Sequence, residues 1–231
     1  MINENKIVVI IPAFNEASSL PNVIQSIPDF VDEIIVVNNG STDSTSDVAI
    51  KAGATVLIEN EKGYGAACLM GIDYIQNKNY DVVVFLDGDF SDYPEEMNFL
   101  VNPIINSDYD FVIGSRMTGK REKGAMLPQA IFGNWLSSFL IKLFWNYKFT
   151  DLGPFRAIKY LSLQKLNMQD RNFGWTVEMQ IKAAKKKLRT FEVPVSYRKR
   201  IGQSKVTGTF SGTLKASIKI LYLIFISLFK N

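Results

Sequence analysis

A run of apolar, mostly β-branched residues at positions 82–86 leads directly into two aspartates, Asp87 and Asp89, separated by one glycine. Such a run is typical of a strand buried on both faces of a parallel sheet. Ligands of open α/β sheets bind at the carboxyl ends of their strands. The sequence therefore predicts a ligand site at these carboxylates, whose oxygens suit Mg²⁺ or Mn²⁺. The alternative interpretation is a strand that simply ends in a polar turn.

Strand-like and helical segments alternate through the first half of the chain. The predicted strands are 7–11, 33–37, 55–58, 81–86 and 110–113. The predicted helices between them are 17–27, 44–52, 64–76 and 95–105. This alternation predicts an α/β fold with a Rossmann-like, mostly parallel sheet and helices on both faces. After these elements we predict a loop at 116–126, an apolar helix at 129–147 and an extended stretch at 151–158. A helix at 175–187 and a strand at 189–197 follow.

The residue types that are missing exclude several kinds of chemistry. The chain of 231 residues has no histidine and a single cysteine, Cys68, which we expect to be buried. It therefore has no Ser-His-Asp triad, no histidine-ligated zinc and no intrachain disulfide. The net charge of +3 is small, but basic residues gather between Lys182 and Lys205, opposed only by Glu192. That block favours anions such as phosphates or acidic lipid headgroups, and we expect no nucleic-acid partner.

The end of the chain is strongly apolar. We expect one domain over residues 1–213 and a separate apolar helix over 214–231, whose residues 220–229 are apolar on nearly every side. This stretch is too short to span a bilayer, which takes about 20 apolar residues. We favour a helix in the membrane interface over dimerisation, and 129–147 is a second candidate for such contact. Because the N-terminus does not resemble a signal peptide, we expect a cytoplasmic protein, peripheral at the inner face of the membrane.

Polar segments follow four of the predicted strands, at 12–16, 38–43, 62–65 and 87–89. In a parallel sheet they all lie along one edge, where a ligand is expected. Gly40 permits the positive φ of a tight turn, and the residues after it can cap a helix whose N-terminus attracts anions.

Taken in order, these motifs resemble family 2 glycosyltransferases of the GT-A fold. The resemblance covers roughly residues 6–205 and rests on IIPAFNE at 10–16, VVNNGSTD at 36–43, Asp87-Gly88-Asp89 with Pro94-Glu95, and GSR at 114–116. Within the family the chain is similar to dolichyl-phosphate mannose synthases and polyprenyl-phosphate glucosyltransferases. The stretches 151–156 and 200–205 support that branch less strongly.

The resemblance implies roles for individual residues. The nucleotide-sugar site is expected to include Pro12, Ala13, Phe14, Glu16, Val37, Asn39, Gly63, Asp87, Gly88 and Arg116. The implied metal ligands are Asp87, Asp89 and Ser91, with Asp89 the stronger. Acceptor and phosphate contacts are expected from Arg198, Arg200, Ser204, Lys205 and Glu178. The chain departs from the family pattern at Asn38 and Asn39, where relatives commonly carry aspartates, and at 90–94, after the metal motif.

The expected reaction is transfer of a sugar, with inversion, from a UDP- or GDP-sugar to a polyprenyl phosphate at the membrane. Asp89, Arg200 and Asp151 are the predicted catalytic residues: the metal and Arg200 would stabilise the departing diphosphate. A hydroxyl acceptor would need a base, for which Asp151 is the candidate, followed by Glu178. Transfer to a soluble or protein hydroxyl, nucleotidyl transfer and non-catalytic nucleotide-sugar binding as a membrane partner subunit are the alternatives.

Overall fold

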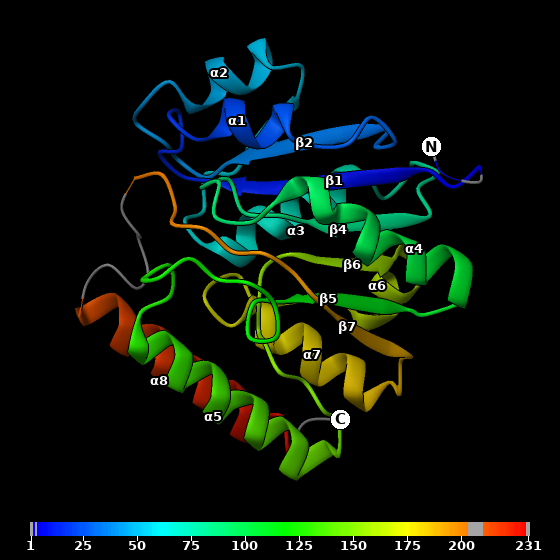
Figure 1. Ribbon diagram of the computed structural model, residues 1–231, viewed down its shortest axis with the longest axis vertical. Helices are drawn as coiled ribbons and strands as arrows, with labels where there is room; N and C mark the ends of the chain where they lie inside the picture. The colour runs from blue at the N-terminus through cyan, green and yellow to red at the C-terminus, as the bar shows by residue number, and fades with distance from the viewer. Residues whose placement is uncertain (1, 3, 203–209, 230–231) are drawn as a thin grey trace.

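A mixed β-sheet with helices on both faces forms the centre of the computed structural model, which describes residues 2, 4–202 and 210–229 apart from the side chains of 210–216 (Figure 1). In the described chain the sheet has seven strands in the order β3-β2-β1-β4-β6-β5-β7. The strands are β1 Ile7–Ala13, β2 Glu33–Asn38, β3 Thr55–Ile58, β4 Val82–Phe85, β5 Phe111–Ser115, β6 Arg156–Lys159 and β7 Thr190–Pro194.

The sheet is parallel except at β6, which pairs antiparallel with both β4 and β5. The prediction of a mostly parallel α/β sheet is therefore confirmed. The central strands are apolar because they are covered on both sides: all four residues of β4 are buried, as are Ile7–Ile11 of β1. Strand β4 lies beside β1, which places the residues after both strands at the same edge of the sheet.

The helices form two layers over the sheet. One layer contains α1 Leu20–Gln25, α2 Thr45–Lys51 and α4 Met97–Ser107, the last preceded by the short 3-10 helix η1 Pro94–Glu96. The opposite layer contains α3 Tyr64–Tyr74, α5 Pro128–Trp145, α6 Tyr160–Leu166, α7 Trp175–Lys185 and α8 Phe210–Ile226. Trp175 is 1% exposed and packs edge-on against Phe85. Cys68 is fully buried, as predicted.

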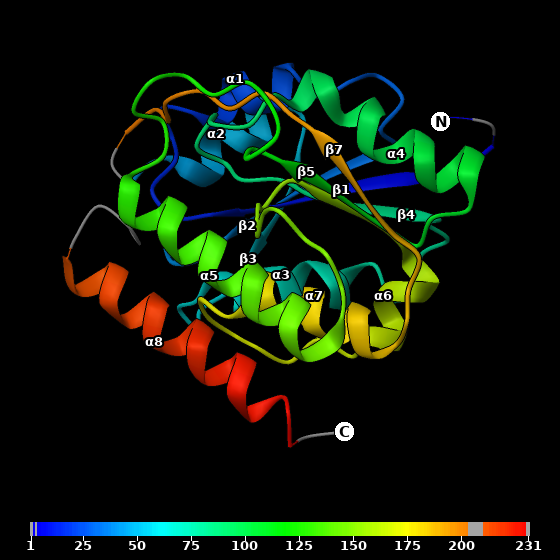
Figure 2. The same ribbon diagram turned by 60° about the horizontal axis from the view of Figure 1, so that its bottom comes forward.

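Helices α5 and α8 lie side by side on the outside of the second layer (Figure 2). The rings of Phe144 and Phe225 meet edge-on between them at 5.9 Å. Both helices nevertheless expose large apolar side chains: Phe132, Trp135, Phe139 and Leu143 on α5, and Ile218, Tyr222 and Phe225 on α8. Within the part of the chain that the structure describes, no helix is both long and apolar enough to cross a membrane.

Candidate active site

The ends of β1, β2 and β4 lie around a cavity of about 550 Å³. Its wall contains most of the predicted nucleotide-sugar and metal residues: Pro12, Ala13, Phe14, Glu16, Asn39, Gly63, Asp87, Gly88 and Asp89. Arg200, predicted for catalysis and phosphate binding, lies in the same wall. Three predicted residues lie elsewhere, because Val37 and Ser91 are buried and Arg116 lines a neighbouring cavity. The topology thus brings together residues from strand ends that are far apart in the sequence.

Asp89 is held from two sides. One carboxylate oxygen accepts hydrogen bonds from the backbone N–H and the hydroxyl of Ser91, and the other forms an ion pair with Arg200 at 3.0 Å. Arg200 also contacts Glu16 at 3.1 Å, so it bridges the ends of β1 and β4. Ser91 is only 1% exposed. Its hydroxyl orients Asp89, and its predicted role as a direct metal ligand remains a prediction.

Asp87 lies deeper, where the hydroxyl of Tyr64 donates a hydrogen bond to it at 3.1 Å. Burial, followed by the charge of Asp89, raises the pKa of Asp87 to about 7. The Tyr64 hydrogen bond and the charges of Arg200 and Arg116 act in the opposite direction. A bound cation would stabilise the ionised form of this carboxyl group, because an opposite charge favours the charged state.

A third aspartate, Asp92, lies close to this pair but is 1% exposed. Neither of its carboxyl oxygens has a hydrogen-bond partner among the described residues. Burial, with the charge of Asp87 next, raises its pKa well above the usual range. The environment of Asp92 therefore favours the neutral carboxyl group more than water does.

The residues present fit a divalent cation of the magnesium or manganese type. The described chain has no group of three or more clustered His, Cys, Asp or Glu side chains. Asp87 and Asp89 are nevertheless both in the cavity wall, and Mg²⁺ is usually held by one or two protein carboxylates, with phosphate and water completing its shell.

Asn39 organises the far side of the cavity. Its amide nitrogen donates to the carbonyl oxygens of Glu59 and Glu61, and its amide oxygen accepts from the N–H of Gly63 at 2.7 Å. The side chain thereby ties the turn before α3 to the end of β2. Its predicted contact with a nucleotide remains a prediction, since these hydrogen bonds join the side-chain amide of Asn39 to backbone groups of the protein.

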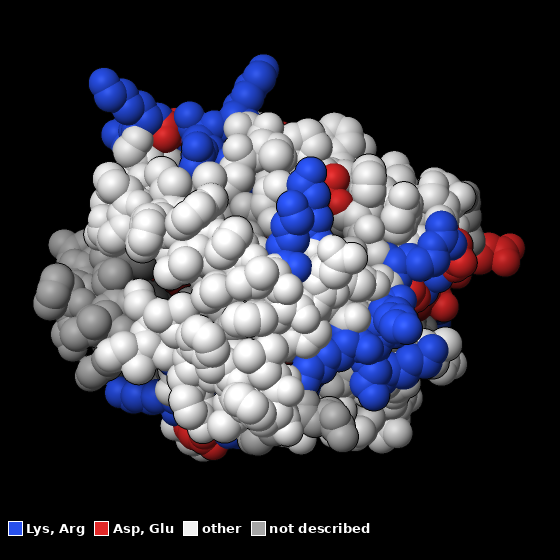
Figure 3. Space-filling model, turned by 90° about the horizontal axis from the view of Figure 1, so that it is seen from below, with Lys and Arg blue, Asp and Glu red and all other residues white. Residues whose placement is uncertain are grey.

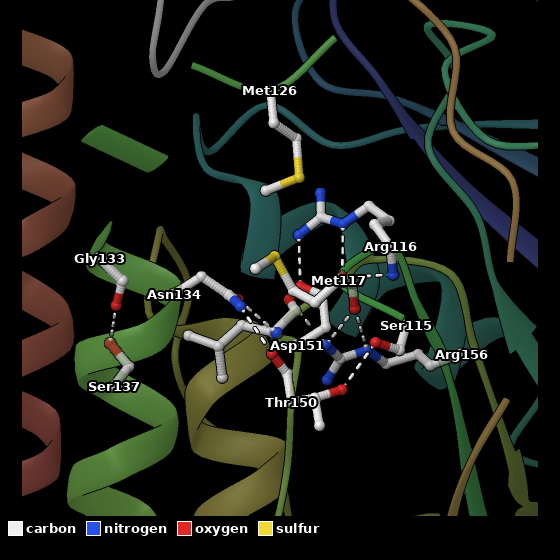
Figure 4. Close-up of polar contacts among 12 residues, drawn as sticks. Ser115, Arg116, Met117, Met126, Gly133, Asn134, Ser137, Thr150, Asp151 and Arg156 are labelled. Atoms are coloured by element: carbon white, nitrogen blue, oxygen red, sulfur yellow. Dashed lines mark hydrogen bonds and ion pairs between the residues drawn. The ribbon is translucent and has the colours of Figure 1, made fainter. Parts of the chain in front are cut away.

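Arg116 and Asp151 form a buried ion pair (Figure 4). The Arg116 guanidinium donates to both Asp151 oxygens at 2.8 and 2.7 Å, and the Arg116 backbone N–H donates a third bond at 2.7 Å. Burial alone would raise the pKa of Asp151, but Arg116 outweighs it and lowers this pKa. Asn134 of α5 fixes the backbone on both sides of Asp151. Its amide nitrogen donates to the carbonyl of Thr150, and its amide oxygen accepts from the N–H of Leu152. This geometry favours a positioning role for Asp151 over a general base.

Two further predicted acceptor residues also contact the protein itself. Arg198 donates to the carbonyl oxygens of Phe90 and Asp92, and its guanidinium lies 3.4 Å from the centre of the Phe90 ring. Glu178 accepts hydrogen bonds from the N–H groups of Gln169 and Asp170, so it supports the segment before α7. Ser204 and Lys205 fall outside the described residues.

Comparison with known proteins identifies the family. The profile described as glycosyl transferase family 2 matches residues 8–164, more than half of the chain. The chain belongs to this family. It is 30% identical over 222 residues to the undecaprenyl-phosphate mannosyltransferase of Micrococcus luteus, with 90% of each chain covered. It is 29% identical to the UDP-N-acetylglucosamine–dolichyl-phosphate N-acetylglucosaminyltransferase of Methanococcus voltae, with 82% of this chain and 84% of that protein covered.

The fold is likewise that of known glycosyltransferases. Glucosyl-3-phosphoglycerate synthase from Mycobacterium tuberculosis, solved with Mn²⁺, UDP and glucosyl-3-phosphoglycerate, superposes with a TM-score of 0.77 at 22% identity. The superposition covers 97% of this chain and 80% of that one. The GT-A assignment and the glycosyltransferase class predicted from the sequence are both confirmed.

This glycosyltransferase has a second cavity, of about 480 Å³, directly beside the first. The two share Tyr64, Asp87, Phe173 and Arg200. The second extends from Arg116 along residues 124–127 to α5 and α8, where Ala130 and Ile220 belong to its wall. Its wall therefore reaches from the residues at the sheet edge to the two outer helices.

Some wall residues were not among the predicted site residues. Tyr64 lies inside the predicted glycine-containing turn, so its position was available from the sequence, although its bond to Asp87 was not. Asn172 and Phe173 come from the segment between α6 and α7, which has no recognisable motif. Contacts across the chain, rather than any local pattern, place these two residues at the site.

Proposed function

We propose that this glycosyltransferase moves a sugar from a UDP- or GDP-sugar to a polyprenyl phosphate at the cytoplasmic face of a membrane. The observation that carries the proposal is the meeting of the two cavities at Asp87 and Arg200. The first cavity would hold the nucleotide sugar and the second would hold the acceptor. The phosphate of the acceptor would then face the sugar of the donor. The relatives named for undecaprenyl and dolichyl phosphates support this acceptor class.

In the donor cavity, Asp89 and Asp87 would hold Mg²⁺ or Mn²⁺, which would neutralise charge on the departing diphosphate. Arg200 would contact the same phosphates, because it lines the donor cavity beside Asp89. Guanidinium groups match phosphate oxygens in charge and geometry. Asp89 and Arg200 are thus the proposed catalytic residues of the donor side.

An acceptor that is already ionised fits the second cavity. Asp151, the candidate base for a hydroxyl acceptor, is fully buried, and both of its oxygens are bonded to Arg116. Glu178, the second candidate, does not line either cavity. A phosphate acceptor needs little base catalysis, whereas a hydroxyl must lose its proton as it attacks. The geometry therefore favours the phosphate over a soluble or protein hydroxyl.

The outer face of α5 and α8 supports membrane contact. Figure 3, which views the molecule from the side of these helices, shows a broad area without charged side chains and with Lys and Arg mostly around its edge. Phe132 and Leu143 are each 61% exposed there, and Tyr222 is 56% exposed. Apolar side chains within a basic rim suit an anionic lipid surface. We propose that residues 1–213 form the catalytic domain and that 214–231 help to bind it to the membrane.

The reaction is tested by offering UDP- and GDP-sugars with Mg²⁺ or Mn²⁺, with and without a polyprenyl phosphate. We expect metal-dependent glycolipid formation, lowered by roughly 100-fold or more in Asp89→Ala, as for loss of a group that stabilises transition-state charge. Asp47→Ala, which removes an exposed aspartate on α2, is the matched control. Transfer to water-soluble hydroxyl acceptors but to no lipid would overturn the acceptor assignment, and nucleotide binding without any transfer would favour a non-catalytic protein.

Membrane contact is tested separately, by co-sedimentation with vesicles containing anionic lipids. Phe132→Ser and Leu143→Ser should each weaken vesicle partition by roughly 10-fold or more, because burying one large apolar side chain contributes about 1.5–3 kcal/mol and about 1.4 kcal/mol corresponds to a factor of 10. Ile50→Ser is the control, since Ile50 is similarly exposed, at 60%, but lies on α2. Unchanged partition of both α5 variants would refute the lipid-facing role of this surface.

A further inference from the structure

The segment between α6 and α7 forms part of the donor cavity and rests directly on the turn before α3. Asn172 and Phe173 line that cavity, and the N–H of Ala66 donates to the Arg171 carbonyl at 2.9 Å. The approach is close: a Cβ on Gly65 would lie 1.9 Å from the Asp170 carbonyl oxygen. A shift of residues 170–174 would therefore move the cavity wall itself.

The conformation of this segment depends on Asp170. One of its carboxylate oxygens accepts hydrogen bonds from the N–H groups of Asn172 and Gly174, at 2.8 and 3.0 Å. The other forms an ion pair with Lys219 of α8 at 2.9 Å. The Asp170 side chain is 2% exposed and that of Lys219 is 37% exposed. A nearly buried carboxylate needs its partners, because leaving it unpaired is costly.

A second contact joins the same two elements without charge. Gly174 packs against Leu223 of α8 so closely that an added Cβ would lie 1.9 Å from the Leu223 Cδ1 atom. Helix α8 therefore reaches the 170–174 segment through two adjacent turns, one by an ion pair and one by packing. Another lysine, Lys185, donates to the carbonyl of Ser227, just after the end of the helix and away from residues 170–174.

We propose that Lys219 is a positioning residue for nucleotide binding. Through Asp170 it fixes the wall that carries Asn172 and Phe173, so that the outer apolar helix supports the donor cavity as well as the face assigned to the membrane. The inference rests on the proposed function for the identity of the donor, but membrane binding is not needed for it. It assigns α8 a part in the site that its apolar sequence does not indicate.

The test is the affinity of the full-length protein for UDP and for GDP with Mn²⁺, measured by calorimetry without lipid. We expect Lys219→Ala to weaken binding of the nucleotide that the wild type prefers by roughly 3- to 10-fold, within the range found for contacting pairs. Lys219→Arg should restore most of the affinity. Lys185→Ala, which removes another lysine contact to α8, is the matched control and should bind like the wild type.

A second variant separates positioning from folding. Asp170→Asn keeps an oxygen that can accept from Asn172 and Gly174 but loses the charge that Lys219 pairs with, so it should lose a similar factor in affinity. The double variant with Lys219→Ala should lose no more than either single variant, since both remove one interaction. Thermal stability should fall more in Lys219→Ala, which leaves the nearly buried Asp170 carboxylate without its counter-charge, than in Asp170→Asn, which removes that charge. In both variants KM for the donor should rise more than kcat falls.

The outcomes are distinct. Wild-type affinity in Lys219→Ala, or an equal loss in Lys185→Ala, would overturn the positioning role while leaving the proposed function intact. Additive losses in the Asp170→Asn and Lys219→Ala double variant would overturn it as well. A wild-type protein that binds neither UDP nor GDP would instead refute the proposed donor, and with it this inference.

Discussion

Replacing Asp151 by asparagine tests whether this residue acts as a base or holds Arg116. The Asp151 carboxylate is fully buried, and the Arg116 side chain is 13% exposed. The substitution keeps the shape but leaves the guanidinium without its counter-charge. Breaking a buried ion pair from one side costs about 3–5 kcal/mol. At about 2–4 °C per kcal/mol for a chain of this size, the unfolding temperature should fall by roughly 6–20 °C.

The assay is denaturant and thermal unfolding of Asp151→Asn, Arg116→Met and the double variant. The double variant should be more stable than Asp151→Asn alone, because no unpaired charge remains buried. Donor turnover should fall with Arg116→Met as well as with Asp151→Asn. An Asp151→Asn protein as stable as the wild type, inactive only with hydroxyl acceptors, would refute the positioning argument and restore Asp151 as a base.

Three further predictions concern other groups. Tyr64→Phe removes a hydrogen bond of about 1 kcal/mol from Asp87, so the Mn²⁺ concentration for half-maximal nucleotide binding should rise about 5-fold, as measured by titration. Arg200→Ala should weaken nucleotide binding but strengthen Mn²⁺ binding in electron paramagnetic resonance titrations, because Arg200 pairs with one oxygen of Asp89. Burial opposes ionisation of Glu33, but hydrogen bonds from its tyrosine and lysine partners lower its pKa below 4.5. Its stabilising contribution is therefore present above pH 4.5 and lost on acidification, so the stability gap to Glu33→Gln should narrow below that pH in chemical unfolding.

The strands of the first half were predictable because they are short, mostly apolar runs bounded by turn residues. The predicted strand at 55–58 coincides with β3, and the run at 81–86 contains β4. Orientation was not predictable at β6: apolar periodicity shows that a segment is buried but not which way it runs. Helix α6, Tyr160–Leu166, was missed because seven residues are too few to show a helical period. Helix α8 begins at Phe210, earlier than the predicted 214, within a stretch rich in residues typical of loops.

The site likewise contains some residues whose position was predictable from the sequence and others whose position was not. Asp87, Asp89 and Glu16 follow predicted strands directly, so the parallel topology alone brings them to one edge. The pairing of Arg116 with Asp151 could not be seen, because the two lie 35 residues apart on segments without shared periodicity. Asp170 likewise forms an ion pair with Lys219, from the far end of the chain. Long-range ion pairs of this kind leave no local signature.

The three arginines near the cavities have different surroundings, and this difference explains how one cation could serve both substrates. Arg198 is bonded to two backbone carbonyls, and Arg116 to a buried carboxylate. Arg200 pairs with Asp89 and Glu16 in the wall of the first cavity, and it also lines the second cavity. Its guanidinium therefore lies where a departing diphosphate and an entering phosphate would come closest. A single fixed cation there would weaken the repulsion between the two anions, which otherwise opposes their approach.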